Sequence, residues 1–249
     1  MIIRDTSSGH WYTRSGEPAY TVQTKTGTRS TTLRDARKLN LVPSVTTVLN
    51  VASKPALELW KQKQLLLAAL TLPKIDSETE EVYIERILTD AKEEGRAAAD
   101  TGTEIHNAIE SFYLGIPSTA YSEHVKATVD HILAVFGTQP WIPERSFAHE
   151  LGFGGKCDLH SNVDDGIILD VKTKTGDLKD VGAYDDHIMQ LAAYRVGLGL
   201  PRAQCANVFV SRTHPGLVRI IDHSEEDTSR GWEMFTHLLK YWQLSKGYQ

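Results

Sequence analysis

The sequence predicts an α/β or α+β fold in which one central mixed β-sheet is flanked by helices. Three observations support this class. Helical apolar spacing dominates residues 51–140, short strands follow from about residue 144 to residue 172, and a helix, two strands and a last helix complete the chain. Because the 249 residues contain no linker-like stretch, we expect a single domain.

That domain, residues 1–249, divides by composition into parts of different character. These parts are a basic, β-rich N-terminal segment (1–50), a mainly helical part (51–140), the sheet core (141–222) and a C-terminal helix (223–249).

The first fifty residues read as short strands followed by an ordered element. Residues 10–32 are interrupted at Ser15-Gly16 and at Thr26-Gly27, which is typical of strands joined by turns. Pro43 begins the ordered element. Pro55 suits the first turn of a helix that runs to about residue 70.

The next part of the chain is expected to hold several further helices. Residues 77–99 show one apolar helical face. Thr101-Gly-Thr-Glu104 matches a capping box, so we expect a new helix to begin at residue 101 and to stop near Gly115. Another helix is expected over residues 121–136.

The remaining elements follow from period-two runs and turn signals. Asp164-Asp165-Gly166 predicts a hairpin between the second and third strands of the core. Ser224 matches a capping box that opens the last helix. The expected strands are 144–150, 153–160, 166–172, 205–211 and 217–222, and a helix is expected over 184–198.

Composition excludes several classes of protein. The chain is 41% hydrophobic and 24% charged, and no apolar run of membrane-spanning length is present. Its start lacks the apolar core of a signal peptide, so we expect a reducing, cytoplasmic or other intracellular location and no secretion. The two cysteines exclude a four-cysteine zinc site and an iron–sulfur cluster.

Charge is distributed unevenly along the chain. The net charge is −5, but residues 1–72 carry ten Lys/Arg against four Asp/Glu, so the rest of the chain is strongly acidic. Trp11, Tyr12, Tyr20 and Trp60 lie in this basic part. Basic residues with interspersed aromatics suit a phosphate backbone and unstacked bases. The alternative is a solvated face with aromatic side chains in the core, and composition leaves both open.

Charged residues close two neighbouring strands of the predicted core. Asp158 ends one strand, and Asp170-Val171-Lys172 follows an apolar run that ends the next. Because residues i and i+2 of a strand share a face, Asp170 and Lys172 point the same way and Val171 points into a core. Carboxylates and an ammonium at the end of buried strands are costly unless something binds there, and a divalent cation would remove that cost.

Helical residues supply further polar groups. Gly102-Thr-Glu-Ile-His106 places a histidine on a helix, with Glu110 one turn later. Gln190 and Tyr194 also lie one turn apart on a common helical face. In this order and spacing, the histidine, the two aspartates with Lys172, and the Gln–Tyr pair resemble the PD-(D/E)XK nuclease superfamily.

Within that superfamily, the set looks like the RecB-type exonuclease branch, which includes phage exonucleases and the mitochondrial genome-maintenance exonuclease. The resemblance covers roughly residues 43–200. It implies a restriction-endonuclease-like core with a helical N-terminal half. It also implies a metal-dependent exonuclease that hydrolyses phosphodiester bonds from DNA ends during replication, recombination or repair, as in phages. The lack of four cysteines sets this chain apart from cluster-bearing members of the branch.

The resemblance implies roles for individual residues. It makes Lys172 the group beside the attacking water or the scissile phosphate, and Gln190 and Tyr194 the contacts to that phosphate, with Gln190 also able to position Lys172. The alternative for Tyr194 is packing against the sheet. The groups that would hold one or two Mg²⁺ or Mn²⁺ ions are His106, Asp158, Asp170 and the backbone carbonyl of Val171.

Other candidates have equally plausible structural explanations. Glu144 is expected near the metals or in an ordinary ion pair with Arg145, and Glu110 either supports the metal site or is a solvated helix charge. Lys174 is a phosphate contact or a loop charge. Trp60 and Lys61 resemble DNA contacts of phage members.

The expected partner is DNA, either single-stranded or a duplex with an end, and no membrane. Two alternative functions stay open at this stage. One is a nicking or structure-specific endonuclease that uses the same site, and the other is a DNA-end-binding module that does not cleave. The sequence determines neither polarity nor oligomeric state.

Overall fold

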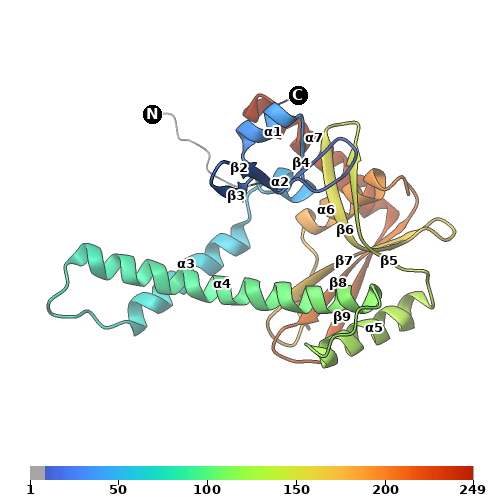
Figure 1. The fold of residues 1–249 in the computed structure, drawn as a ribbon. Coiled ribbons are helices and arrows are strands. Elements are labelled where there is room, and N and C mark those ends of the chain that lie inside the picture. Colours follow the sequence, from blue (N-terminus) through green and yellow to red (C-terminus); the bar gives the residue numbers. More distant parts are fainter. Residues whose placement is uncertain (1–8, 249) are drawn as a thin grey trace.

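The structure, a computed structural model, describes residues 9–248. Its centre is a five-stranded mixed sheet flanked by helices, which confirms the predicted fold class (Figure 1). Residues 1–8 of the predicted basic segment lie outside the described residues. In spatial order, the strands of the sheet are β5 (Ile142–His149), β6 (Phe153–Ser161), β7 (Ile167–Lys174), β8 (Gln204–Ser211) and β9 (Val218–His223).

Helices and two small ribbons precede and surround this sheet. The ribbons pair β1 (Trp11–Tyr12) with β4 (Val42–Pro43), and β2 (Thr21–Thr24) with β3 (Gly27–Ser30). The helices are α1 (Leu33–Leu39), α2 (Val45–Leu49), α3 (Pro55–Thr71), α4 (Glu80–Tyr113), α5 (Ser122–Phe136), α6 (Asp185–Gly197) and α7 (Glu225–Lys246).

The sheet has an apolar core on each face. Strands β7 and β8 are parallel and are joined by α6, whereas the other neighbours are antiparallel. Ile168 belongs to the core under α2, α6 and α7, and the adjacent Leu169 belongs to the core under α4 and α5. Because successive strand residues point to opposite faces, β7 is buried on both sides. It is therefore the element on which groups from both layers converge.

The predicted helix start at residue 101 is wrong, because α4 runs unbroken from Glu80 to Tyr113. Its N-cap is Thr79, whose hydroxyl accepts from the Val82 amide. The two residues of the predicted capping box are Thr101 and Glu104, and Glu104 has another partner here, since its carboxylate accepts from the Tyr121 hydroxyl at 2.5 Å. The neighbouring Thr103 Oγ1 donates to the Ala99 carbonyl within α4 at 3.0 Å. A capping box needs an extended residue at its start, which a continuing helix does not provide.

The aromatic residues nearest the N-terminus are core residues. Trp11 and Tyr12 are 2% and 3% exposed. Trp11 packs against Trp242 and Tyr248, so the N-terminal ribbon is fastened to the end of α7. The interpretation of these two side chains as base-stacking groups is therefore wrong, since buried rings offer no face to a nucleotide.

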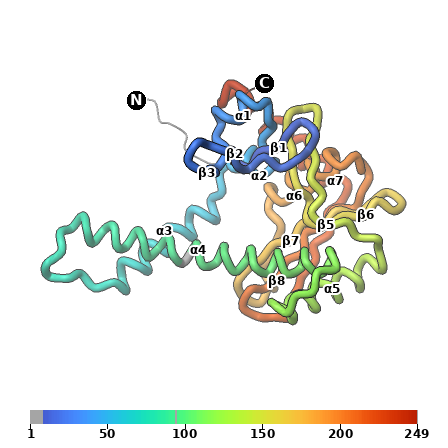
Figure 2. Tube along the Cα trace, viewed as in Figure 1, coloured from blue at the N-terminus to red at the C-terminus, as the bar shows by residue number. Residues whose placement is uncertain are grey.

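Helices α3 and the first half of α4 project from the sheet as an arm, which we define as residues 55–97 (Figures 1 and 2). The two helices run antiparallel, since the Tyr83 hydroxyl donates to the Leu72 carbonyl and Trp60 lies against Gly95. The second half of α4 packs on β7. None of the helices in residues 9–248 has the length and apolar composition needed to cross a membrane.

Candidate functional site

The candidate site forms where β6 and β7 separate. The two strands pair only from Leu159 to Ser161. Just before this stretch, Asp158 Oδ2 accepts the backbone N–H of Val171 at 2.8 Å, so a side chain replaces the neighbouring strand. Because the N–H and C=O of one strand residue point to the same side, the Val171 carbonyl also faces this gap.

This geometry corrects one feature of the sequence prediction. Asp158 and Asp170 lie inside β6 and β7 and not at the ends of those strands. Strand β7 continues beyond Asp170 because its parallel pairing with β8 extends to Lys174 and Ser211. The charged groups therefore line a break within the sheet, where polar side chains take over backbone hydrogen bonds.

Helix α4 brings His106 to this break. Gly102, one turn earlier, permits the close approach, since a Cβ there would lie 2.6 Å from Thr173 Oγ1 on β7. His106 Nε2 lies 2.9 Å from Asp158 Oδ2. The negative charge of Asp158 raises the pKa of His106 despite the opposing effect of burial. A helix and a strand thus supply one half of a polar cluster.

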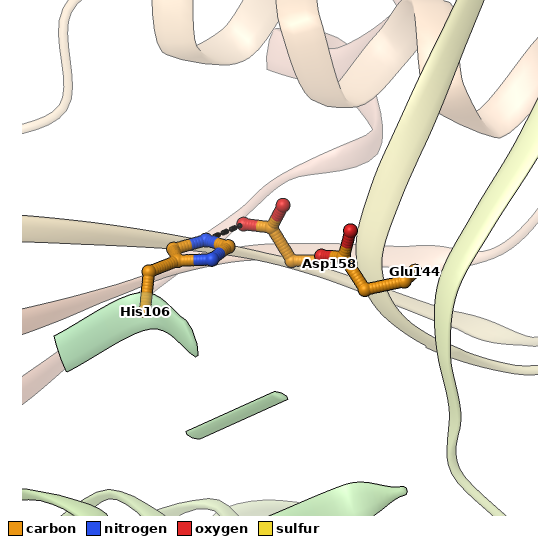
Figure 3. Close-up of side chains that lie close together, drawn as sticks. All are labelled: His106, Glu144 and Asp158. Carbon is orange, nitrogen blue, oxygen red and sulfur yellow. Dashed lines mark ion pairs between the residues drawn. The ribbon is translucent and has the colours of Figure 1, made fainter. Parts of the chain in front are cut away.

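Glu144 completes the cluster from β5. Its neighbours Pro143 and Arg145 pair with Leu159 and Cys157, so Glu144 lies opposite Asp158. Figure 3 shows the Glu144 carboxylate beside Asp158 and His106. Its backbone has φ +52°, a left-handed conformation that is uncommon for a side chain of this kind and that is concentrated at functional sites.

The donor set of this cluster fits a divalent cation. The nitrogen or oxygen ligand atoms of His106, Glu144 and Asp158 lie within 4.8 Å of one another. Lys156 is the ion-pair partner of Glu144, so the alternative pairing with Arg145 is wrong. The Glu144 oxygen that Lys156 contacts, Oε2, is buried. Carboxylates suit Mg²⁺ and Mn²⁺, and an imidazole ligand suits transition metals such as Mn²⁺ better than Mg²⁺.

Asp170 lies on the other side of β7, facing α6. It is 1% exposed, and both of its oxygens are engaged. Oδ1 accepts from Lys172 Nζ and Oδ2 accepts from the Asn207 amide, each at 2.8 Å. Asn207 in turn contacts His223 Nε2 at 2.8 Å. In this structure Asp170 holds Lys172, and its role as a metal ligand stays a prediction.

Helix α6 supplies the second hydrogen-bond acceptor of Lys172. Gln190 Oε1 accepts from Lys172 Nζ at 3.1 Å, and Gln190 Nε2 donates to the Tyr194 hydroxyl at 2.8 Å. Tyr194 is 4% exposed and packs edge-on against Phe147. It therefore packs against the sheet, as the alternative interpretation held, and it orients Gln190. The contact between Gln190 and Lys172 is the one that the positioning role requires, and that role stays a prediction.

Burial and charge act against each other in this network. Burial raises the pKa of Asp170 to about 6. Burial also pushes the pKa of Asp158 upward, but His106 and Lys172 outweigh it and the net shift is downward. For Lys172, burial favours the neutral amine, yet Asp170 and Asp158 raise its pKa overall. Lys172 therefore carries its charge at neutral pH.

A cleft of about 360 Å³ gives access to these groups. His106, Val171 and Lys172 line it, together with Arg212. The Arg212 guanidinium is held by the hydroxyls of Thr173 and Thr175 at 3.4 and 2.7 Å, and burial lowers its pKa. Among the described residues no carboxylate pairs with it, so Arg212 is available to an anion in the cleft.

Sequence reasoning missed Arg212, Asn207 and Lys156. Arg212 and Asn207 lie on or beside β8, which becomes the neighbour of β7 only after the α6 crossover. A buried asparagine in an apolar strand was the one available signal for Asn207, whereas nothing local distinguished Arg212.

The other residues predicted to act at the site lie outside the histidine–carboxylate cluster. Lys174 lies over the Tyr184 ring, with Nζ 5.5 Å from its centroid. Glu110 is half-buried one turn beyond His106 and outside the three-residue cluster. Trp60 and Lys61 lie on the arm, where Lys61 pairs with Glu58 at 2.8 Å. Their contact with DNA stays a prediction.

The chain is similar to several solved structures. No protein-family model matches the chain, and no curated protein sequence matches it. Among solved structures, it is similar to a candidate exonuclease of Eubacterium rectale, with 13% identity and a TM-score of 0.43 over 60% of this chain and 69% of that one. It is also similar to the protein SSO0001, with 16% identity and a TM-score of 0.33 over 74% of this chain and 86% of that one.

Proposed function

We propose that this chain is a divalent-metal-dependent DNA exonuclease of the RecB-type branch of the PD-(D/E)XK superfamily. The observation that carries the proposal is the meeting of two groups at one break in the sheet. A histidine–carboxylate cluster that fits a cation, His106, Glu144 and Asp158, lies on one side. The charged Lys172, held by Asp170 and Gln190, lies beside it at the same cleft.

The cluster would hold the ion. His106, Glu144 and Asp158 are its proposed ligands, with the Val171 carbonyl facing the same gap. When bound, a divalent cation polarises a phosphoryl oxygen and acidifies water. The ion would also offset the negative charges of Glu144 and Asp158, which lie close together and are offset in this structure by Lys156 and His106.

The cations at the cleft would act on the phosphate. Lys172 offsets the negative charge that develops on the phosphoryl oxygens, and its hydrogen bonds to Asp170 and Gln190 fix the ammonium in place before the reaction. Arg212 presents a planar guanidinium on which two phosphate oxygens fit. We assign it to the phosphate adjoining the scissile one. Asp170 and Gln190 are thus positioning residues for Lys172.

A nuclease assay with matched variants tests the proposal. Single- and double-stranded DNA labelled at the 5′ or 3′ end is incubated with Mg²⁺, Mn²⁺ or chelator. We expect metal-dependent shortening from an end, reduced by about 10²-fold or more in Lys172→Met and Asp158→Asn. Asp164→Asn, in the β6–β7 turn outside the site, and Lys126→Met on α5 are the controls. Equal digestion by the parent and the site variants would refute the assignment.

A covalently closed circle and a metal titration complete the test. Resistance of the circle supports an exonuclease, and nicking of it supports an endonuclease on the same site. Calorimetric titration with Mn²⁺ should show binding to the parent and a loss of at least about tenfold in affinity for Asp158→Asn. Identical Mn²⁺ binding by the two proteins would remove Asp158 from the ligand set, whatever the activity.

A further inference from the structure

The arm leaves a row of leucines uncovered. Leu59, Leu66, Leu67 and Leu70 of α3, which we call the leucine stripe, are between 53% and 84% exposed. Residues 59, 66 and 70 are seven and four apart, so they share one face of the helix. Ala68 is the buried residue of α3 and faces elsewhere. Helix α3 therefore uses one face for α4 and offers a second apolar face to solvent.

Such a helix needs a further partner. A helix that is apolar on several faces is normally buried in a protein or in a membrane. Contiguous exposed apolar surface on a protein marks a site of association with another protein or with a membrane, and the charges beside it favour one or the other.

The arm also carries a groove of complementary character. This acidic groove, with a volume of about 520 Å³, lies along α4 and includes the apolar side chains of Leu72 and Val82. Its one guanidinium, Arg86, is already paired with Glu78 at 2.8 Å. The carboxylates that line it are Glu81, Glu85, Asp90 and Glu93.

The stripe and the groove have opposite charges. Lys63 lies within the leucine stripe at the spacing of residues 59, 66 and 70, whereas Lys61, two residues away, is already paired with Glu58 at 2.8 Å. The apolar side chains fit the apolar lining, and the ammonium of Lys63 fits the acidic rim. Stripe and groove lie on different helices of one arm, so the complementary surfaces meet only between two molecules or after the arm refolds.

We propose that the arm is a self-association device, in which the leucine stripe of one copy docks in the acidic groove of α4 of a second copy. The mode is an amphipathic helix in a groove. A helix of 17 residues is only about 25 Å long, so the contact lies at the small end of stable interfaces. We therefore expect association that depends on protein concentration, in about the micromolar range.

Sedimentation equilibrium of the full chain tests this directly. The mass of the parent should exceed that of the monomer as concentration rises from about 1 to 200 µM, and should fall again in high salt. Leu66→Glu, on the stripe, and Glu85→Lys/Glu93→Lys, in the groove, should each remain monomeric. Leu244→Glu, at a similarly exposed leucine of α7, should associate like the parent.

Mixing the two defective proteins gives the decisive result. Leu66→Glu keeps an intact groove, and Glu85→Lys/Glu93→Lys keeps an intact stripe. The mixture should form a pair although neither protein associates alone. A parent that stays monomeric throughout the concentration range, an unaffected Leu66→Glu, or a mixture that stays monomeric would each overturn the proposal. Circular dichroism would check that each variant is folded, and none of these readouts depends on nuclease activity.

Discussion

Replacing Lys172 by methionine isolates the electrostatic cost of Asp170. The substitution keeps an unbranched side chain but removes the ammonium that donates to Asp170 Oδ1 at 2.8 Å. Asp170 is 1% exposed, and its pKa of about 6 already lies above its ordinary value of 3.8 because of burial. Loss of the ammonium raises that pKa further, since the nearest positive charge is gone.

The magnitude follows from linkage. Each pKa unit corresponds to about 1.4 kcal/mol. The raised pKa of Asp170 therefore lowers the free energy of unfolding of the parent at pH 7 by roughly 3 kcal/mol relative to an unperturbed aspartate. If Asp170 stayed protonated at pH 7, as the variant allows, the free energy of unfolding would be lower by roughly 4 kcal/mol relative to an unperturbed aspartate. The variant is therefore destabilised by at most about 1 to 2 kcal/mol at pH 7 through this effect.

The sign of the pH dependence is definite. An acid with a raised folded pKa destabilises the fold increasingly as pH rises from its unfolded value to its folded value, and the effect is constant above that. The parent reaches the constant range above about pH 6, while the variant continues to lose stability. The two proteins should thus differ little through Asp170 at pH 5 and increasingly toward pH 8.

Urea unfolding in chelator, followed by tryptophan fluorescence from pH 5 to pH 8, measures this difference. Lys172→Met/Asp170→Asn is the control, because a side chain that never ionises should abolish the pH-dependent part. A stability difference of the same size at pH 5 and pH 8 would contradict the reasoning. It would mean that Lys172 stabilises the fold by packing and not by offsetting the Asp170 charge.

Three further perturbations probe other parts of the molecule. Gly197→Ala should lose about 1 to 3 kcal/mol in urea unfolding, because its Cβ would lie 1.9 Å from the Phe147 ring, whereas Gly182→Ala, which meets nothing within 4 Å, should be nearly neutral. The hydrogen bond with Arg195 lowers the pKa of Glu225 from 4.5 to about 2. Glu225 should therefore stabilise the fold relative to Glu225→Gln above pH 4.5, and this stabilisation should disappear as the pH falls toward 2. Equal stabilities of the parent and Glu225→Gln at every pH would show that the Glu225–Arg195 ion pair does not stabilise the fold. Arg212→Gln should weaken DNA binding and reduce the slope of log affinity against log salt by about one, if Arg212 contacts one phosphate.

The elements of the sheet could be predicted because each has a local signature. The Asp164-Asp165-Gly166 turn and its flanking apolar runs define the β6–β7 hairpin, and Ser224 accepts from the Asp227 amide to start α7 as expected. The helix start predicted at Thr101 failed for a physical reason. A capping box is a local preference of about 1 kcal/mol, and packing of a continuous α4 on β7 exceeds it.

The candidate site divides in the same way. Asp158, Asp170, Lys172, His106 and the Gln–Tyr pair on α6 were proposed as site residues from their order and spacing and from the resemblance that these carry, and their roles stay predictions. The division of these residues into two groups was not predicted, because it depends on which face of β7 each side chain occupies. The sequence left Glu144 either near the metals or in an ion pair with Arg145, and the β5–β6 register that sets it opposite Asp158 comes only from the pairing of the two strands.

The sequence by itself therefore determined the fold class, most of the elements and the residue types of the candidate site, because periodicity, turns and caps act over a few residues. The tertiary structure decided how those residues combine. It placed Asp158 at the break between β6 and β7 and Arg212 at the cleft, and it made Lys172 and Asn207 the hydrogen-bond donors to Asp170. These contacts join residues far apart in the chain, and only the packing of β8 beside β7 and of α4 across the sheet brings them together.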